Sequence, residues 1–166
     1  MPERQHINVN LVLVLAGTAG VAYLIYKSTQ NVKGLLSNPL QDQAIESTKS
    51  NPAWDPNYWQ QFGNPPGTGN KLLYWSQIIP IAQALYNDLG NFYIPWLFST
   101  ANPSAVVADV QQIKNKPQFS QLVWYFSKNY NEDLFTKMYK QLLGGASGTP
   151  AATLSRVLDY VNSLPS

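Results

Sequence analysis

Residues 11–26 read LVLVLAGTAGVAYLIY, and this run of sixteen residues without a charge sets the architecture of the whole chain. Its length approaches the roughly 20 apolar residues that a helix needs to cross a bilayer. A charge near the middle of such a helix would cost about 2.5 to 3.5 kcal/mol. The remaining sequence is more polar. The sequence therefore predicts one membrane-embedded helix followed by a water-compatible region.

The predicted anchor has an apolar body and an interfacial end. Tyr23 and Tyr26 lie where aromatic side chains gather at the boundary between membrane and water. Lys27 follows them and can extend its amine to the headgroups. The apolar side chains that would contact lipid are Leu11, Val12, Leu13, Val14, Leu15, Val21, Leu24 and Ile25.

Small residues occupy the middle of the run, at Ala16, Gly17 and Gly20. In lipid, small residues let two helices approach closely, so one interpretation is a helix-packing face. The other is that Gly and Ala are simply frequent in spanning helices.

Two other interpretations of the run stay open. A secretory signal peptide has a basic start and small residues at a cleavage site, whereas Arg4 is offset by Glu3 here. A buried core helix is the second, because sixteen residues are short for a span. Helical spacing of apolar residues continues to Leu36, and a Pro at position 39 is the first firm stop. We therefore expect an anchor region over residues 1–37.

Residues 38–70 are rich in Pro, Gly, Asn, Gln and Ser and are predicted to form a connector. A short helix is expected inside it, because Asp55 is a good N-cap, Pro56 suits the first helical position and Gly63 suits a left-handed stop. The aromatic side chains of this helix form either a docking patch for a partner or for headgroups, or the face that folds onto the helix's own domain. They are Trp54, Tyr58, Trp59 and Phe62.

Residues 71–166 have a helical period throughout, which predicts a bundle of about five helices and an all-α fold. No strand is predicted, and the aromatic stretch 91–101 is expected to be a buried loop. Gly90 is expected to end the first helix. The expected helix starts are Ser76, Asn102–Pro103, Pro117, Asn131 and Thr149–Pro150. The residues expected to face inward are Ile78, Ile81, Ala82, Leu85, Leu89, Val106, Val110, Ile113, Phe119, Leu122, Val123, Phe126, Leu134, Met138, Leu142, Leu154, Val157, Leu158, Val161 and Leu164.

The order of these helices carries a resemblance. Residues 81–90 (IAQALYNDLG) and 105–145 (AVVADVQQIKNKPQFSQLVWYFSKNYNEDLFTKMYKQLLGG) resemble one annexin-type helical repeat. Such single repeats are similar to domains in proteins of bacteria and their phages. Calcium binding is not implied, because residues 90–94 read GNFYI in place of the family's Gly-x-Gly-Thr loop. The residues that fit the repeat are Phe119, Leu122, Tyr130, Asp133, Leu134 and Leu143.

The amino-acid composition limits the partners, metal sites and catalytic groups that can be expected. The net charge is only +2 and the Lys and Arg residues are scattered, so no nucleic-acid partner is expected. There is no Cys, which excludes disulfides and Cys-based zinc sites. The only His is His6, beside the apolar run, so neither a His-rich metal site nor a His-based triad is expected. Carboxylates are too dispersed for calcium, so neither a metal nor a cofactor is expected. Asp88 and Asp109 either meet across two helices as an acid–base pair or lie on ordinary solvated faces.

These features favour a membrane-anchored structural or interaction protein over an enzyme. The charged fraction is 12%, about half the usual share, and such a surface suits contact with other proteins. The leading expectation is a minor capsid protein of a bacteriophage virion, which links an internal lipid membrane to a protein shell and contacts capsid subunits or sister copies. The alternatives are a single-pass protein of a bacterial envelope that presents a binding module, and a membrane-anchored enzyme. No small-molecule substrate is expected.

Overall fold

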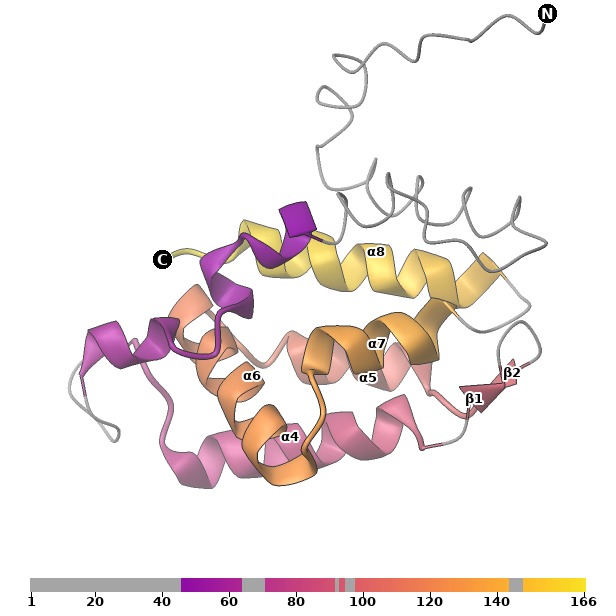
Figure 1. Ribbon diagram of the computed structural model, residues 1–166, viewed down its shortest axis with the longest axis horizontal. Helices are drawn as coiled ribbons and strands as arrows, with labels where there is room; N and C mark the ends of the chain where they lie inside the picture. Colours follow the sequence, from indigo (N-terminus) through magenta and orange to yellow (C-terminus); the bar gives the residue numbers. More distant parts are fainter. Residues whose placement is uncertain (1–45, 64–70, 92, 95–97, 144–147) are drawn as a thin grey trace, which may run out of the picture.

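The computed structural model describes residues 46–63, 71–91, 93–94, 98–143 and 148–166 of the chain (Figure 1). The predicted anchor region 1–37 lies outside these residues, and with it every residue of the run 11–26. Five α-helices form among the described residues that follow position 70, and the predicted all-α class is confirmed for the described part of the chain. The elements are η1 (Pro52–Trp54), η2 (Tyr58–Phe62), α4 (Trp75–Leu89), β1 (Tyr93–Ile94), β2 (Phe98–Ser99), α5 (Pro103–Val110), α6 (Lys116–Tyr130), α7 (Leu134–Leu143) and α8 (Gly148–Ser163).

A minimal β-ladder interrupts the helices where no strand was predicted. Tyr93 pairs with Ser99, and Ile94 pairs with Phe98, in an antiparallel register. Aromatic and β-branched residues favour extended backbone, which accounts for the pairing. Two residues on each side are too few to show the alternation by which a strand is recognised in a sequence.

The predicted start of α5 and the expected end of α4 are confirmed. Asn102 caps α5, since its Oδ1 accepts a hydrogen bond from the backbone N–H of Ala105 at 3.5 Å. Gly90 ends α4 with φ 72° and ψ 167°, a conformation that glycine adopts far more easily than other residues. The start of α6 lies close to the predicted Pro117, with Asn115 as its cap.

Two other predicted caps were wrong. The first helix begins before Ser76, because the Oε1 of Gln77 reaches back to the N–H of Tyr74 at 3.0 Å. Asn131 does not open α7; it ends α6 in the left-handed conformation, with φ 53°. Asp133 takes the capping role instead, since its Oδ1 accepts hydrogen bonds from the N–H and the hydroxyl of Thr136, at 2.8 and 2.6 Å.

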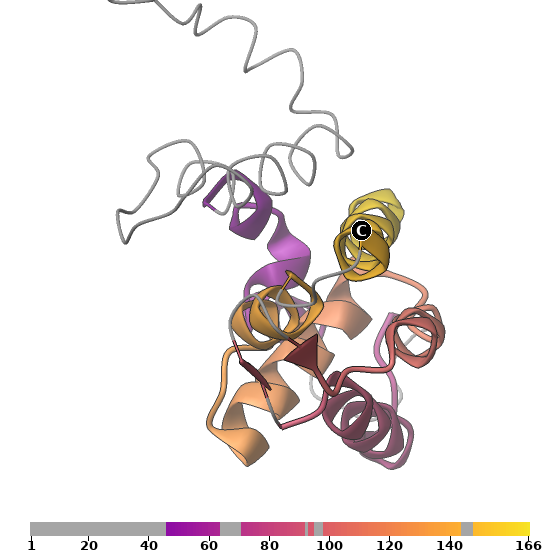
Figure 2. The same cartoon turned by 90° about the vertical axis from the view of Figure 1, so that its right-hand side faces the viewer.

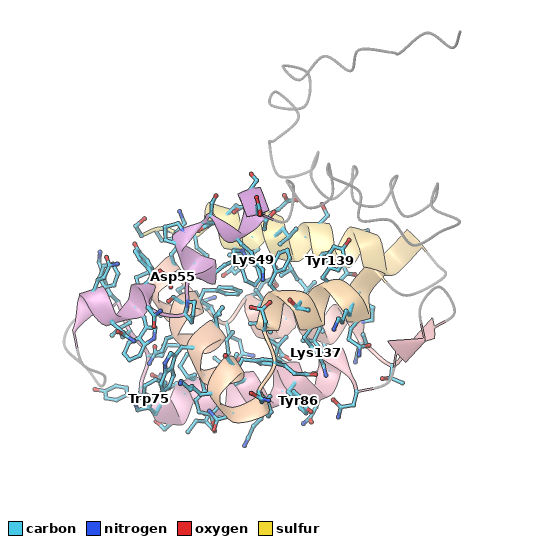
Figure 3. The ribbon with its side chains drawn as sticks, viewed as in Figure 1. Lys49, Asp55, Trp75, Tyr86, Lys137 and Tyr139 are labelled. Carbon is cyan, nitrogen blue, oxygen red and sulfur yellow. The ribbon has the colours of Figure 1, made fainter. Side chains whose placement is uncertain are left out.

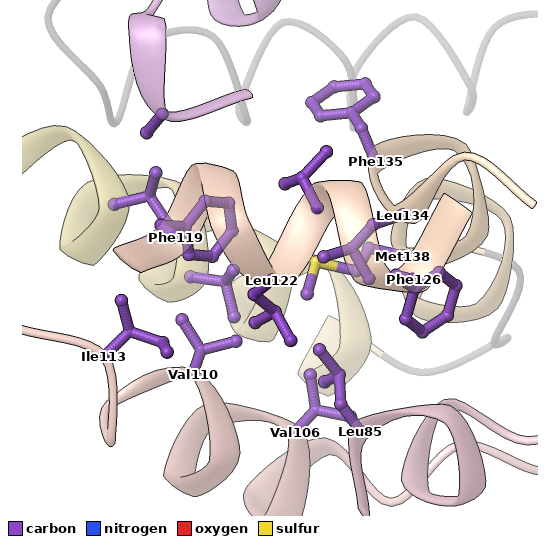
Figure 4. Packing of buried hydrophobic residues seen from close by; sticks show 14 of the residues in the cluster. Leu85, Val106, Val110, Ile113, Phe119, Leu122, Phe126, Leu134, Phe135 and Met138 are labelled. Carbon is purple, nitrogen blue, oxygen red and sulfur yellow. The ribbon is translucent and has the colours of Figure 1, made fainter. Parts of the chain in front are cut away.

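The helices pack around α6, which crosses the middle of the core (Figures 1 and 4). Phe119, Leu122 and Phe126 project from it and are completely buried. Helix α5 packs against both α4 and α8, so α4 and α8 lie on opposite sides of the body (Figure 2). All twenty residues that the sequence predicts to face inward are buried, which confirms the period assigned to each helix.

Residues 46–63, which we call the strap, belong to the same packed unit. Lys49 forms an ion pair of 3.1 Å with Asp133, and Asn51 Nδ2 donates to Asn162 Oδ1 at 2.6 Å. Ala53 and Trp54 are buried in the common core. The folded unit therefore starts well before Lys71, inside the segment predicted as a connector.

The short helix predicted after Asp55 forms as the 3-10 helix η2 and starts at Tyr58. Asp55 Oδ1 accepts a hydrogen bond from the N–H of Asn57 at 2.8 Å, so its capping bond lies just before the helix. Gly63 ends it with φ 101°. The Oγ of Ser120 on α6 accepts from the N–H of Trp59 at 3.1 Å and donates to the carbonyl of Asp55. One buried hydroxyl thus ties the strap to the central helix.

Candidate functional site: a carboxylate pair and an aromatic surface

Asp88 and Asp109 face each other where α4 packs against α5. Asp109 is only 8% exposed. The pKa of its carboxyl group is raised from 3.8 to about 6, mainly by burial and in addition by repulsion from the facing Asp88 and a hydrogen bond with it. Each residue lies in the last turn of its helix, where the negative end of the helix dipole also disfavours a negative charge. The surroundings of the two carboxyl groups therefore favour a proton bound to the pair.

The hydrogen bonds of Asp109 are incomplete. Its Oδ1 accepts from Gln112 Nε2 at 3.3 Å, whereas its buried Oδ2 accepts no hydrogen bond from the described residues. A proton shared with Asp88 would remove this mismatch, because a protonated carboxyl group is a donor. Of the two interpretations from sequence, the solvated helix face does not describe Asp109, and the two carboxylates do come together.

A group of partly exposed rings lies at the start of α4 and on α6. We call Tyr74, Trp75, Trp124 and Tyr125 the aromatic surface. The ring centroids of Trp75 and Trp124 are 5.4 Å apart, and those of Trp75 and Tyr125 are 6.3 Å apart. Tyr74 is 51% exposed and is the most exposed large hydrophobic side chain of the described residues. Trp59, 8% exposed, lies beneath and contacts both tryptophans edge to face.

A buried glutamine positions this surface. The side chain of Gln121 on α6 is fully buried and makes two hydrogen bonds to the backbone of Leu73. Its Oε1 accepts from the Leu73 N–H at 3.1 Å, and its Nε2 donates to the Leu73 carbonyl at 2.9 Å. These bonds fix the chain immediately before Tyr74 and Trp75, whose place is marked in Figure 3.

The segments that carry the aromatic surface have no acidic residue. Neither residues 56–87 nor residues 115–131 contain an Asp or a Glu, whereas they contain three lysines. Lys128 is exposed on α6, three and four positions after the two α6 rings, and therefore lies on their side of the helix. Lys71 Nζ lies 5.0 Å from the ring centroid of Phe62 and donates to the backbone oxygen of Ser166 at 3.3 Å. The local charge is thus positive.

Lys137 is a buried cation that sequence reasoning missed. Its Nζ forms an ion pair of 2.9 Å with Glu132 and a hydrogen bond of 3.2 Å with Asn91 Oδ1. It also lies 4.8 Å from the ring centroid of Tyr86, which stacks on Tyr130 (Figure 3). These partners come from two stretches of sequence, residues 86–91 and 130–132, and only the tertiary fold brings the first of them to Lys137. With so many partners, Lys137 serves as a structural cross-link.

The docking patch predicted from sequence is mostly internal. Trp54 is 6% exposed and packs edge to face against Phe119 and Phe135. Trp59 is buried as described above, while Tyr58 and Phe62 are half-buried and face each other at 5.1 Å. The second interpretation of the short helix, that it folds onto its own domain, therefore describes both tryptophans. Large indole rings gain most when they are buried against the bundle.

The predicted anchor residues of the run 11–26, and Lys27 after it, lie outside the described residues. Among the residues that the structure does describe, no helix has the length and apolar character required to cross a bilayer. These same residues contain no group of three or more His, Cys, Asp or Glu side chains positioned to hold a metal ion.

No family model, curated protein or solved structure matches the chain. The annexin-type resemblance of residues 81–145 thus rests on the quoted residues alone and stays a prediction.

Proposed function

We propose that this protein is a membrane-anchored structural protein, in which residues 11–26 hold the helical domain at a lipid bilayer. The observation that carries the proposal is the run itself, sixteen residues without a charge. Only nineteen residues separate Tyr26 from Glu46, where the described domain begins. A fully extended chain of that length spans at most roughly 70 Å, so an anchored run keeps the domain close to the membrane.

The finer proposal is a minor virion protein that joins an internal lipid membrane to a protein shell. It is supported by the low charged fraction of 12% and by a domain that packs as one unit from the strap to α8. A rigid domain of low charge suits permanent contact with neighbouring subunits, because few charges have to lose their water on assembly. The alternative is a single-pass protein of a bacterial envelope that presents the same domain.

Flotation with lipid vesicles tests the anchor. The full chain reconstituted into vesicles is expected to float and to resist extraction at alkaline pH. Leu15→Arg places a charge inside the run and is expected to release much of the protein. Ser47→Arg adds the same charge at an exposed position of the strap and is the matched control. Sedimentation of the unaltered chain away from the lipid would contradict the anchor.

Co-purification separates the virion from the cellular envelope. A virion protein is expected to purify with particles and to leave them only when detergent dissolves their lipid. Recovery of the chain as a detergent-solubilised monomer from uninfected cells would contradict the virion proposal while leaving the anchor intact.

A further inference from the structure

We propose that the aromatic surface of Tyr74, Trp75, Trp124 and Tyr125 is a second membrane contact, which lies against the anionic headgroups of the bilayer that holds the anchor. This inference rests on the proposed function, because it requires the chain to be at a membrane. It assigns the domain an orientation: the start of α4 and the exposed side of α6 face the lipid.

The chemistry of the rings suits the boundary between lipid and water. Tryptophan and tyrosine are amphipathic, and they gather at the headgroup level of membranes. Tyr74 is half exposed, and Trp75 and Trp124 are partly exposed above the buried ring of Trp59. The indole N–H groups of the inner rings of Trp54 and Trp59 are buried without a hydrogen-bond partner. The outer rings of Trp75 and Trp124 are the ones that partial exposure makes available to headgroups.

The charge around the rings favours an anionic surface. The two segments that carry them contain lysines and no acidic residue, and the exposed Lys128 lies on the side of α6 that carries Trp124 and Tyr125. Basic residues near a membrane are attracted to the negative potential of anionic lipids. Acidic residues beside the rings would oppose this attraction, and there are none in residues 56–87 or 115–131.

The nineteen residues that link the anchor to the domain explain why a small aromatic surface would be enough to bind lipid. Once residues 11–26 are embedded, nineteen residues link them to the domain, and binding of the surface becomes an intramolecular event. A short linker gives an effective concentration in the millimolar range, so weak contacts become populated. A free protein partner has no such advantage, which is why we assign the surface to lipid.

Tryptophan fluorescence offers a direct test on the full chain. All five tryptophans follow residue 53, so emission reports only on the domain and the strap. The chain would be reconstituted into phosphatidylcholine vesicles with or without phosphatidylglycerol, each carrying a lipid quencher near the headgroups. We expect a loss of emission that is larger with phosphatidylglycerol and smaller at high salt.

Exposed positions provide variants that should fold. Tyr74→Glu combined with Lys128→Glu is expected to restore emission in the quenching vesicles while the protein still floats. Lys140→Glu changes the same kind of charge at an exposed position of α7 and should leave the quenching unchanged. Circular dichroism of each variant checks that the helices remain.

The outcomes separate this inference from the proposed function. A chain that floats but shows no quenching overturns the lipid contact and leaves the anchor. A chain that does not float overturns both. A photo-crosslinker at position 74 is expected to label lipid; if it labels a second copy or another protein instead, the surface is a protein contact and the inference is wrong.

Discussion

The indole ring of Trp54 meets the ring of Phe119 edge to face, with the two centroids 4.7 Å apart. Trp54 also meets Phe135 edge to face, with ring centroids 5.1 Å apart and ring planes at 90°. Such edge-to-face pairs add to the gain from burying the rings. Because Phe119 lies on α6 and Phe135 on α7, one side chain of the strap locks two helices of the bundle together.

Replacing Trp54 by Ala should therefore destabilise the whole domain. We expect a loss of about 3 to 5 kcal/mol in the free energy of unfolding, the usual cost of deleting a buried aromatic side chain. Urea unfolding followed by circular dichroism measures it, with the half-buried Tyr58→Ala as control. A loss similar to that of the control would mean that the strap is not part of the cooperative unit.

The carboxylate pair should make stability fall as pH rises. The pKa of Asp109 is raised to about 6 in the folded protein, so between pH 4 and 6 the folded state binds more protons than the unfolded state. Its contribution is fully present below pH 4 and is lost as pH rises through 6. Asp109→Asn mimics the protonated group, and we expect a stability gain on the order of 1 to 3 kcal/mol at pH 7.

Thermal unfolding between pH 4 and 7 measures this dependence. The asparagine variant should lack the decline with pH that the unaltered chain shows. Asp88→Asn removes the facing charge and should reduce the decline without abolishing it. An identical decline in the unaltered chain and in Asp109→Asn would show that another group is responsible.

The contribution of Asp133 to stability has the opposite pH dependence, and it changes at lower pH. Burial alone would raise the pKa of its carboxyl group, but hydrogen bonds from Thr136 and Lys49 lower it below the ordinary value. Its contribution is therefore present above pH 4 and is lost on further acidification. Asp133→Asn separates this acid-side loss from the effect of Asp109.

The buried and exposed ion pairs should differ in strength. Lys137→Met removes the buried cation that joins Glu132, Asn91 and Tyr86, and we expect a loss of about 1 to 3 kcal/mol. Lys49→Met removes an ion pair whose side chains are 40% and 49% exposed, and we expect a loss of about 0 to 1 kcal/mol. Parallel urea titrations compare the two. Equal losses would contradict the structural role of Lys137.

Gly90 should not tolerate a side chain. With φ 72° and ψ 167°, it lies in a region that is almost confined to glycine, and a Cβ there would collide with Thr100. We expect Gly90→Ala to cost about 1 to 3 kcal/mol in unfolding experiments. Ser76→Ala, at an exposed position of α4, is the neutral control. An unchanged unfolding midpoint for Gly90→Ala would disprove the positive φ.

Helical periodicity predicted the core, because every buried face repeats over several turns within one segment. Capping was predicted less well, since Asn131 and Asp133 both suit a helix terminus by local chemistry. Only the need to reverse the chain direction decides between them: asparagine tolerates the left-handed end of α6, and aspartate caps α7. A sequence window around either residue contains no information about that reversal.

The candidate sites also differ in how well the sequence predicts them. The meeting of Asp88 and Asp109 follows from two adjacent helices and could be foreseen. The burial of Trp54 against Phe119 joins residues far apart in sequence, so local patterns show only that Trp54 is large and apolar. The aromatic surface combines residues of α4 and α6, and its only sequence signal is the absence of acidic residues from both segments.

The strap also determines how mechanical load would enter the domain. If residues 11–26 are held in lipid and the domain is pulled away, tension reaches residues 46–54 first. There it is resisted side by side by the Lys49–Asp133 ion pair, the Asn51–Asn162 hydrogen bond and the wedged ring of Trp54. Contacts that share a load fail together, at a higher force than contacts that break one by one. The strap would thus act as a mechanical clamp that protects the helices from forced unfolding.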